Sequence, residues 1–155
     1  MKFKLKKAKI KDSEIGKNVT IYDPSNIYNC KICDDVFIGP FVEIQRNSKI
    51  GKSSKVQSHS FICEGVQIGE NCFIGHSVVF INDKFSDGSP ANGDKSKWKK
   101  TEISDNVYIG SNSTILPVKI CSDVVIGAGS VVTKNITHPG KYAGNPAKQI
   151  KDKIV

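Results

Sequence analysis

The chain has 155 residues, 38% of them hydrophobic and 25% charged, which suits one domain with a continuous core and excludes a disordered chain. Its formal net charge is +8, from 23 Lys and Arg against 15 Asp and Glu, and Arg46 is the single arginine. Arginine is the usual residue for bidentate contacts with phosphates and bases, so this balance favours small anionic ligands such as nucleotides over nucleic acid.

No apolar run reaches the roughly 18 residues that span a bilayer, so the sequence predicts no membrane insertion. The basic residues 1–10 lack the apolar segment of a signal peptide, and we therefore expect a cytoplasmic protein. Lysines alternate with Phe3 and Leu5 in this stretch, which predicts that residues 1–14 form a charged segment at the edge of the fold.

A six-residue repeat dominates the rest of the chain. Residues two apart share one face of a strand, and a helix of period 3.6 cannot keep a strict period of six on one face. Each repeat therefore predicts a very short strand with two inward side chains, followed by a tight corner. Three strands would close a triangular turn of 18 residues, and the whole series would make about six turns. The large apolar residues of the series are Ile15, Ile21, Ile27, Ile32, Ile38, Ile44, Ile50, Val56, Ile62, Ile68, Ile74, Phe80, Ile103, Ile109, Ile115, Ile120, Ile126 and Val132.

In this repeat a large aliphatic residue is often followed by Gly, and a small residue stands two positions before the next large one. The pattern resembles the repeat of the hexapeptide-repeat acyltransferases. The resemblance covers about residues 15–150 and implies an all-β fold, a left-handed parallel β-helix. It also implies a homotrimer, because members of the family usually form trimers with active sites between subunits. We expect a single domain over 1–155, with an edge segment at 1–14, the β-helix at 15–132 and a cap at 133–155.

Between Phe80 and Ile103 the rhythm stops for 22 residues, 81–102, where it would allow five. The segment is rich in Gly, Pro, Asn, Asp and Ser, which predicts a loop that leaves the β-helix. Loops that project from rigid solenoids commonly carry function. The loop holds the only tryptophan, Trp98, and several lysines that match no fixed motif: Lys84, Lys95 and Lys97.

The cap contains Gly-Asn-Pro-Ala-Lys at residues 144–148. This ending resembles that of coenzyme-A-dependent members of the family and implies acetyl-CoA as co-substrate, with no metal. Its pantetheine is expected to run between turns of neighbouring subunits, where small residues allow close backbone approach and lysines meet the phosphates. The residues expected to bind the cofactor are Gly110, Ser111, Ala128, Gly129, Lys134 and Lys148, with Lys141 as a further candidate.

Residues about 18 apart stack on neighbouring turns, so His59 and His76 are expected near each other at one corner. The same arithmetic predicts a second polar corner where the loop leaves, made of Arg46, Glu64, Asn82 and Asp83.

Residues 57–66 and 74–83 look like segments of sugar N-acetyltransferases that act on nucleotide-linked amino sugars. That resemblance implies that Asn82 and Glu64 lie near the acceptor amine and that the Asn-Asp pair lies close to the thioester. A neutral amine attacks a thioester directly, so one base that removes a proton is enough. The candidate catalytic residues are His76, His59, Asn82, Asp83 and Glu64, and the candidate substrate-binding residues are Arg46, Glu64, Asn82, Lys84 and Trp98.

The expected function is acetyl transfer from acetyl-CoA to the amino group of a UDP- or dTDP-linked amino sugar, in a ternary complex. An O-acetyltransferase is the main alternative, although the loop holds no histidine to serve as the strong base that a hydroxyl needs. A scaffold without catalytic activity and a γ-class carbonic anhydrase are further alternatives. The latter needs three zinc-binding histidines, and His138 lies in the cap, far from the other two. The five cysteines are expected to fill slots of the β-helix as thiols.

Overall fold

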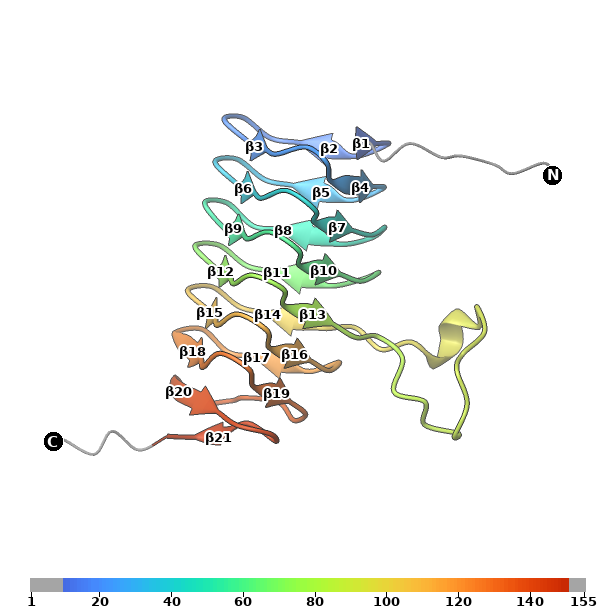
Figure 1. Cartoon of the computed structure of the whole chain (residues 1–155), viewed down its shortest axis with the longest axis vertical. Helices are drawn as coiled ribbons and strands as arrows, with labels where there is room; N and C mark the ends of the chain where they lie inside the picture. The colour runs from blue at the N-terminus through green and yellow to red at the C-terminus, as the bar shows by residue number, and fades with distance from the viewer. Residues whose placement is uncertain (1–9, 151–155) are drawn as a thin grey trace, which may run out of the picture.

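The computed structural model describes residues 10–150, so residues 1–9 of the predicted edge segment and residues 151–155 lie outside the described part. Two- to four-residue strands stack into three sheets, here named A, B and C, which the chain visits in that order on every turn (Figure 1). Within the described residues the one helix is the short 3-10 helix η1 (Lys95–Lys97), and no helix is long and apolar enough to cross a bilayer.

The strands of each sheet follow the predicted repeat. Sheet A holds β1 (Ile10–Lys11), β4 (Asn26–Tyr28), β7 (Glu43–Ile44), β10 (Phe61–Ile62), β13 (Val79–Phe80), β16 (Thr114–Ile115) and β19 (Val131–Val132). Sheet B holds β2 (Glu14–Ile15), β5 (Lys31–Ile32), β8 (Lys49–Ile50), β11 (Gln67–Ile68), β14 (Glu102–Ile103) and β17 (Lys119–Ile120). Sheet C holds β3 (Thr20–Ile21), β6 (Phe37–Ile38), β9 (Lys55–Val56), β12 (Phe73–Ile74), β15 (Tyr108–Ile109), β18 (Val124–Ile126), β20 (Gly140–Ala143) and β21 (Lys148–Gln149).

The predicted fold class is confirmed, and the number of turns differs slightly from the prediction. Six turns were expected, whereas sheets A, B and C contain seven, six and eight strands. The additional strands lie at the two ends, before and after the repeat. β1 pairs with β4 ahead of the first predicted hexad, while β20 extends sheet C and β21 pairs with it in antiparallel orientation.

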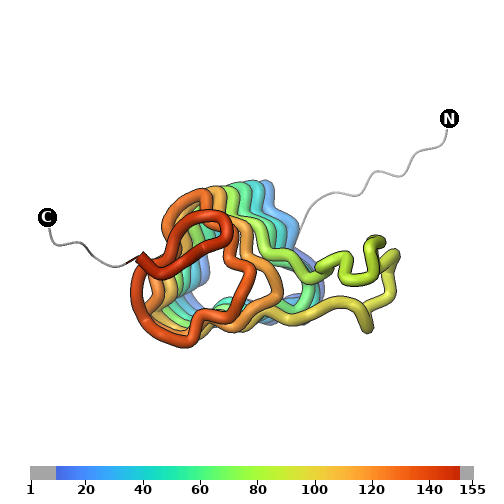
Figure 2. The backbone as a smooth tube through the Cα atoms, turned by 90° about the horizontal axis from the view of Figure 1, so that it is seen from below, coloured from blue at the N-terminus to red at the C-terminus, as the bar shows by residue number. Residues whose placement is uncertain are grey.

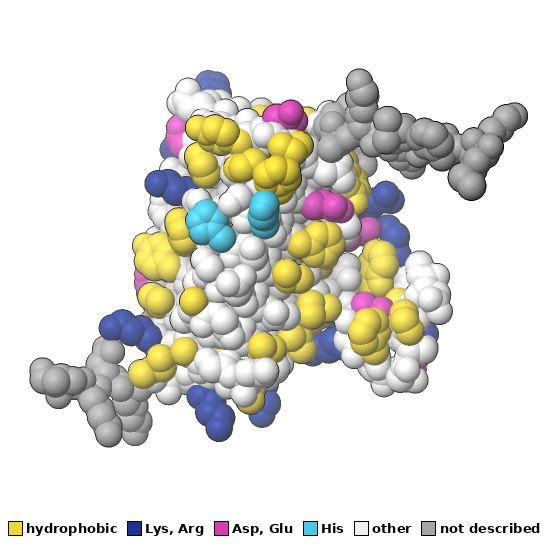
Figure 3. Space-filling view, in the orientation of Figure 1, with side chains coloured by type: hydrophobic (Ala, Val, Ile, Leu, Met, Phe, Trp, Pro, Cys, Tyr) yellow, Lys and Arg dark blue, Asp and Glu magenta, His cyan; other side chains and the backbone are white. Residues whose placement is uncertain are grey.

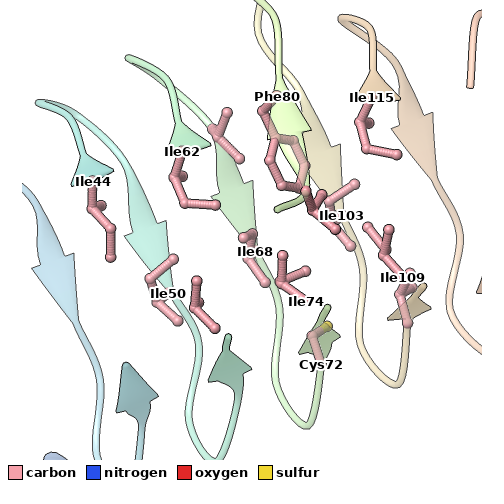
Figure 4. Close-up of a cluster of buried hydrophobic side chains, with 14 of the residues drawn as sticks. Ile44, Ile50, Ile62, Ile68, Cys72, Ile74, Phe80, Ile103, Ile109 and Ile115 are labelled. Carbon is pink, nitrogen blue, oxygen red and sulfur yellow. The ribbon is translucent and has the colours of Figure 1, made fainter. Parts of the chain in front are cut away.

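In the two-residue strands from β5 (Lys31–Ile32) to β17 (Lys119–Ile120) the second residue is buried and stacks on its equivalent in the next turn. Ile44 is in register with Ile62, and Phe80 with Ile115, and all four side chains are fully buried (Figure 4). Removing so many aliphatic side chains from water is the main source of stability. The register explains why a strict period of six suffices to specify this core.

The small inward positions are filled by valines, serines and cysteines. The Ser54 hydroxyl donates a hydrogen bond to the carbonyl oxygen of Gly69 at 2.9 Å, so a buried polar group has its partner. Cys30 and Cys72 occupy equivalent positions, and all five cysteines are free thiols. Burial raises the pKa of Cys63 to about 12, which keeps this thiol protonated at neutral pH.

Three corners join the sheets, and two of them hold predicted site residues: corner AB, between sheets A and B, and corner CA, between sheets C and A. The turns approach closely at corner CA, where a Cβ on Gly110 would lie 2.4 Å from the backbone nitrogen of Ala128. Glycine is therefore required at this position by the stacking distance.

The insertion leaves the β-helix at corner AB and comprises residues 81–101, because Glu102, the last residue of the predicted loop, belongs to β14. It projects sideways from the stack, and the turns on both sides remain in contact (Figures 1 and 2). Gln67 of β11 pairs with Glu102 of β14, so the register of sheet B continues across the insertion.

Candidate functional site

The predicted site residues lie at two corners that stand at opposite ends of sheet A. Corner CA precedes the sheet A strand of each turn and corner AB follows it, so the strand separates them within one chain. Corner CA carries His59, His76, Gly110, Ser111, Ala128 and Gly129, and corner AB carries Arg46, Glu64, Asn82 and Lys134.

At corner CA the two histidines come together as the repeat predicts. The exposed His76 ring has its Nδ1 atom 2.9 Å from the hydroxyl oxygen of Ser58, one turn earlier. The exposed His59 ring packs against Phe41, with ring centroids 4.8 Å apart. Figure 3 shows two histidine side chains next to each other on this face, below a group of hydrophobic side chains.

The hydrogen bond between Ser58 and His76 affects whether the imidazole can act as a base. If the Nδ1 proton is donated to the Ser58 oxygen, the Nε2 lone pair is free to accept a proton from an attacking nucleophile. Sequence reasoning did not single out Ser58. The signal was available, because Ser58 is Val56 plus two and His76 is Ile74 plus two, the same position in successive turns of sheet C.

At corner AB the structure brings Glu64, Asn82 and Arg46 together. The Glu64 side chain is only 15% exposed, and the guanidinium Nε of Arg46 lies 3.7 Å from its Oε2. The side-chain amide of Asn82 donates to the Glu64 backbone carbonyl at 3.5 Å, and the amide of Asn47 donates to Oε1 at 3.2 Å. Sequence reasoning did not single out Asn47.

The insertion supplies the closest partner of Glu64. The ammonium Nζ of Lys95 lies 2.7 Å and 3.0 Å from the two carboxylate oxygens, and 5.6 Å from the centre of the Trp98 ring. A cavity of about 180 Å³ lies where the insertion meets the corner. Lys84 is exposed and does not line it; the lining residues are Asn47, Glu64, Gly65, Lys95, Trp98, Lys99 and Lys100.

Asp83 accepts hydrogen bonds from the backbone of the insertion at two places. Its Oδ1 accepts the backbone N–H of Phe85 at 2.9 Å and its Oδ2 accepts that of Ala91 at 2.7 Å. Both carboxylate oxygens of Asp83 thus hold the backbone of the insertion in place. Further along, Asp94 caps η1 by accepting from the backbone and hydroxyl of Ser96, and these bonds lower the pKa of Asp94.

The predicted cofactor residues fall into two places. Gly110 and Ser111 stand one turn before Ala128 and Gly129 at corner CA, where the N–H of Gly129 donates to the carbonyl of Ser111 at 2.8 Å. Lys148 is close to this corner, because it pairs with Ala143 at the end of β20. Lys134 follows β19 and therefore lies at corner AB, away from the other five.

Among residues 10–150 there is no group of three or more His, Cys, Asp and Glu side chains placed to hold a metal ion. His138 lies in the cap, where its Nδ1 is 3.0 Å from the hydroxyl of Thr137.

Comparison with known families identifies the repeat. The family described as bacterial transferase hexapeptide (six repeats) matches residues 29–64 and 47–82, and the hexapeptide repeat of succinyl-transferase matches residues 100–134. Together these matches cover more than half of the 155 residues.

Individual relatives agree with this assignment. The bifunctional protein GlmU of Thermodesulfovibrio yellowstonii is 38% identical over 135 residues, which are 83% of this chain and 30% of GlmU. The chain thus spans about a third of the length of the curated relatives that it matches.

Among solved structures, AntD, an N-acyltransferase from Bacillus cereus in complex with dTDP and coenzyme A, superposes with a TM-score of 0.79 and 26% identity, covering 90% of this chain and 83% of AntD. A maltose O-acetyltransferase from Clostridium difficile superposes with a TM-score of 0.63 and 25% identity, covering 89% of this chain and 68% of that enzyme. The chain therefore belongs to the hexapeptide-repeat transferase family.

Proposed function

We propose that the protein is an acetyl-CoA-dependent N-acetyltransferase that acts on the amino group of a UDP- or dTDP-linked sugar. The observation that carries the proposal is at corner AB, where the shielded Glu64 carboxylate holds the ammonium group of Lys95. A carboxylate in this position favours an amine over a hydroxyl, because only the amine brings a positive charge. The similarity to AntD, an N-acyltransferase in complex with dTDP and coenzyme A, supports the same class of acceptor.

A complete site requires two copies of the chain. Five of the six proposed cofactor residues lie at or near corner CA, and the proposed acceptor residues Arg46, Glu64 and Asn82 lie at corner AB, at the opposite end of sheet A. Packing corner CA of one copy against corner AB of the next brings them together, and three such contacts close a cyclic trimer. This supports the homotrimer that the family resemblance implies.

The outward side chains of the sheets favour the same arrangement. On sheet C, the outward side chains of Phe73, Tyr108 and Val125 are hydrophobic and 38–46% exposed. The equivalent positions of sheet B are mostly charged, with ion pairs such as Lys31 to Glu14 at 3.0 Å. Exposed apolar surface of this kind is usual at contacts between subunits, whereas a ladder of ion pairs is usual at a face that meets water.

In the proposed reaction the bound ammonium group of the acceptor first gives one proton to water, and the neutral nitrogen then attacks the thioester carbon. A carbon–nitrogen bond forms, the proton of the amine passes to Nε2 of His76, and the carbon–sulfur bond then breaks as the thiolate leaves. His76 returns the proton to the thiolate, which restores the neutral imidazole. A backbone N–H at corner CA is the proposed donor to the oxyanion. Ser58 holds the imidazole through Nδ1.

A hydroxyl acceptor is the second candidate. It is favoured by the similarity to maltose O-acetyltransferase and by the Ser58–His76 pair, which supplies the base that a hydroxyl needs. In that case the acceptor does not need the charge of Glu64.

Free-thiol release from acetyl-CoA tests these proposals. UDP- and dTDP-linked amino sugars are each paired with the matching hydroxyl analogue and with a blank without enzyme. Release with an amino sugar alone supports N-acetylation, and release with its hydroxyl analogue supports O-acetylation. His76→Ala and Asn82→Ala should lower the rate, and His138→Ala, in the cap, is the matched control. Absence of release together with absence of coenzyme A binding would contradict the enzymatic proposal.

A further inference from the structure

The Glu64–Lys95 contact joins a residue of the β-helix to a residue of the insertion. Glu64 belongs to the turn between β10 and β11, within the rigid stack, and its side chain is 15% exposed. Lys95 belongs to the insertion, and its side chain is 52% exposed. Through Lys95, the insertion therefore places an ammonium group against the Glu64 carboxylate, which belongs to the β-helix.

The surroundings of this ammonium group are those of a cation-binding site. Two carboxylate oxygens lie 2.7 Å and 3.0 Å from Nζ of Lys95, and the Trp98 ring lies 5.6 Å away. A carboxylate combined with an aromatic face is a common way to recognise an ammonium ion. The cavity of about 180 Å³ adjoins both groups, so a second ammonium-bearing molecule has a route to them.

We propose that Glu64 and Trp98 form an ammonium-binding site which Lys95 fills, and that the protonated amino group of the acceptor takes this site by displacing Lys95. The inference rests on the proposed function, because it assigns the acceptor amine to corner AB. Lys95 is then an internal competitor. It lowers the apparent affinity for amino acceptors by the fraction of molecules in which it remains on Glu64.

Removing the ammonium group of Lys95 should strengthen the binding of amino acceptors only. In Lys95→Gln the dissociation constant for the UDP- or dTDP-linked amino sugar should fall about three- to tenfold, while that for the hydroxyl analogue stays unchanged. Lys100→Gln is the matched control, because Lys100 lines the same cavity and Glu64 has no hydrogen bond or ion pair to it among the described residues. Equal weakening of both ligands in Lys95→Gln would instead mean that Lys95 binds a group they share, such as the phosphates, and would overturn the inference.

The single tryptophan gives a second readout that needs no turnover. In Lys95→Gln the face of Trp98 loses its cation, and the fluorescence of this tryptophan should differ from that of the wild type. Binding of an amino sugar to Lys95→Gln should shift the emission back towards that of the wild type, whereas binding of the hydroxyl analogue should not. An equal response to both ligands, or no binding of any amino sugar, would overturn the inference.

The two proposals can fail separately. Selective binding with the Lys95 effect, but no thiol release from acetyl-CoA, would refute the transferase reaction and keep the ammonium site. Thiol release with an amino sugar whose affinity does not respond to Lys95→Gln would keep the reaction and refute the ammonium site.

Discussion

A shared active site makes a quantitative prediction about mixtures of two defective chains. His76→Ala removes the proposed base at corner CA and should lower the rate at least about 100-fold, since a positioned base contributes that much or more. Glu64→Gln removes the carboxylate proposed to hold the acceptor ammonium at corner AB and should also lower the rate strongly. The two corners stand at opposite ends of sheet A, so each proposed site takes one corner from each of two neighbouring copies. A mixed trimer can therefore contain a site in which both halves are intact.

The size of the recovery follows from this geometry. In an equal random mixture, a site has an intact corner CA with a probability of one half and an intact corner AB from the neighbour with a probability of one half. About a quarter of the sites, and hence of the wild-type rate, should return in a cyclic assembly. Thiol release would be measured on the unfractionated mixture after co-expression of differently tagged chains, with each variant alone as a control. Purification through both tags removes the trimers made of one variant, and the expected recovery then rises to about a third, because every mixed trimer has one intact site among its three.

Two results would refute this reasoning. If both halves of a site came from one chain, every site in the mixture would carry a defect and the rate would stay at the level of the single variants. If His76→Ala alone kept nearly the full rate, the imidazole would not be the base, and the mechanism proposed for corner CA would be wrong.

Three further predictions concern the β-helix itself. Phe80→Ala should lower the free energy of unfolding by about 4 kcal/mol, because this side chain is fully buried, whereas Val79→Ala on the outer face should change it by less than about 0.5 kcal/mol; guanidinium unfolding measures both. Gly110→Ala should cost at least about 2 kcal/mol in the same assay, because its Cβ would press on the neighbouring turn, and unchanged stability would contradict the close stacking. The raised pKa of Cys63 keeps its proton on the folded protein where the unfolded chain loses it, so this contribution to stability is complete below pH 9.0 and declines as the pH rises towards 12. Unfolding at about pH 8 and about pH 10.5 should show a smaller loss for Cys63→Ala than for the wild type.

The periodic part of the molecule was predictable because one period determines both the core and the corners. Once Ile62 and Phe80 are assigned to the inward column, the position of Glu64 beneath Asn82 follows from counting. The same counting places Lys134, as Val132 plus two, at corner AB, so its assignment to the cofactor came from the family's ending and not from its place in the repeat.

The insertion could not be predicted in the same way. Its path depends on local bonds that no period specifies, such as those of Asp83 to the backbone of Phe85 and Ala91. The contact of Lys95 with Glu64 joins residues 31 positions apart through that path, so the sequence indicated a basic loop near this corner without indicating which lysine reaches the carboxylate. The extra strands β1 and β20 lie beyond the repeat and have no residue pattern of their own.

The unbroken register across the insertion has a consequence for how such proteins diverge. Stacked partners are 18 residues apart in an ordinary turn and 35 apart across the insertion, as for Glu70 and Asp105. That near doubling of the closed segment costs only about 0.6 kcal/mol of chain entropy. Burial of one isoleucine, such as Ile103 directly after the insertion, offsets this cost several times over, at about 1.5–3 kcal/mol. The segment is in effect an exchangeable cassette: evolution or an engineer can replace the part proposed to meet the acceptor without disturbing the β-helix.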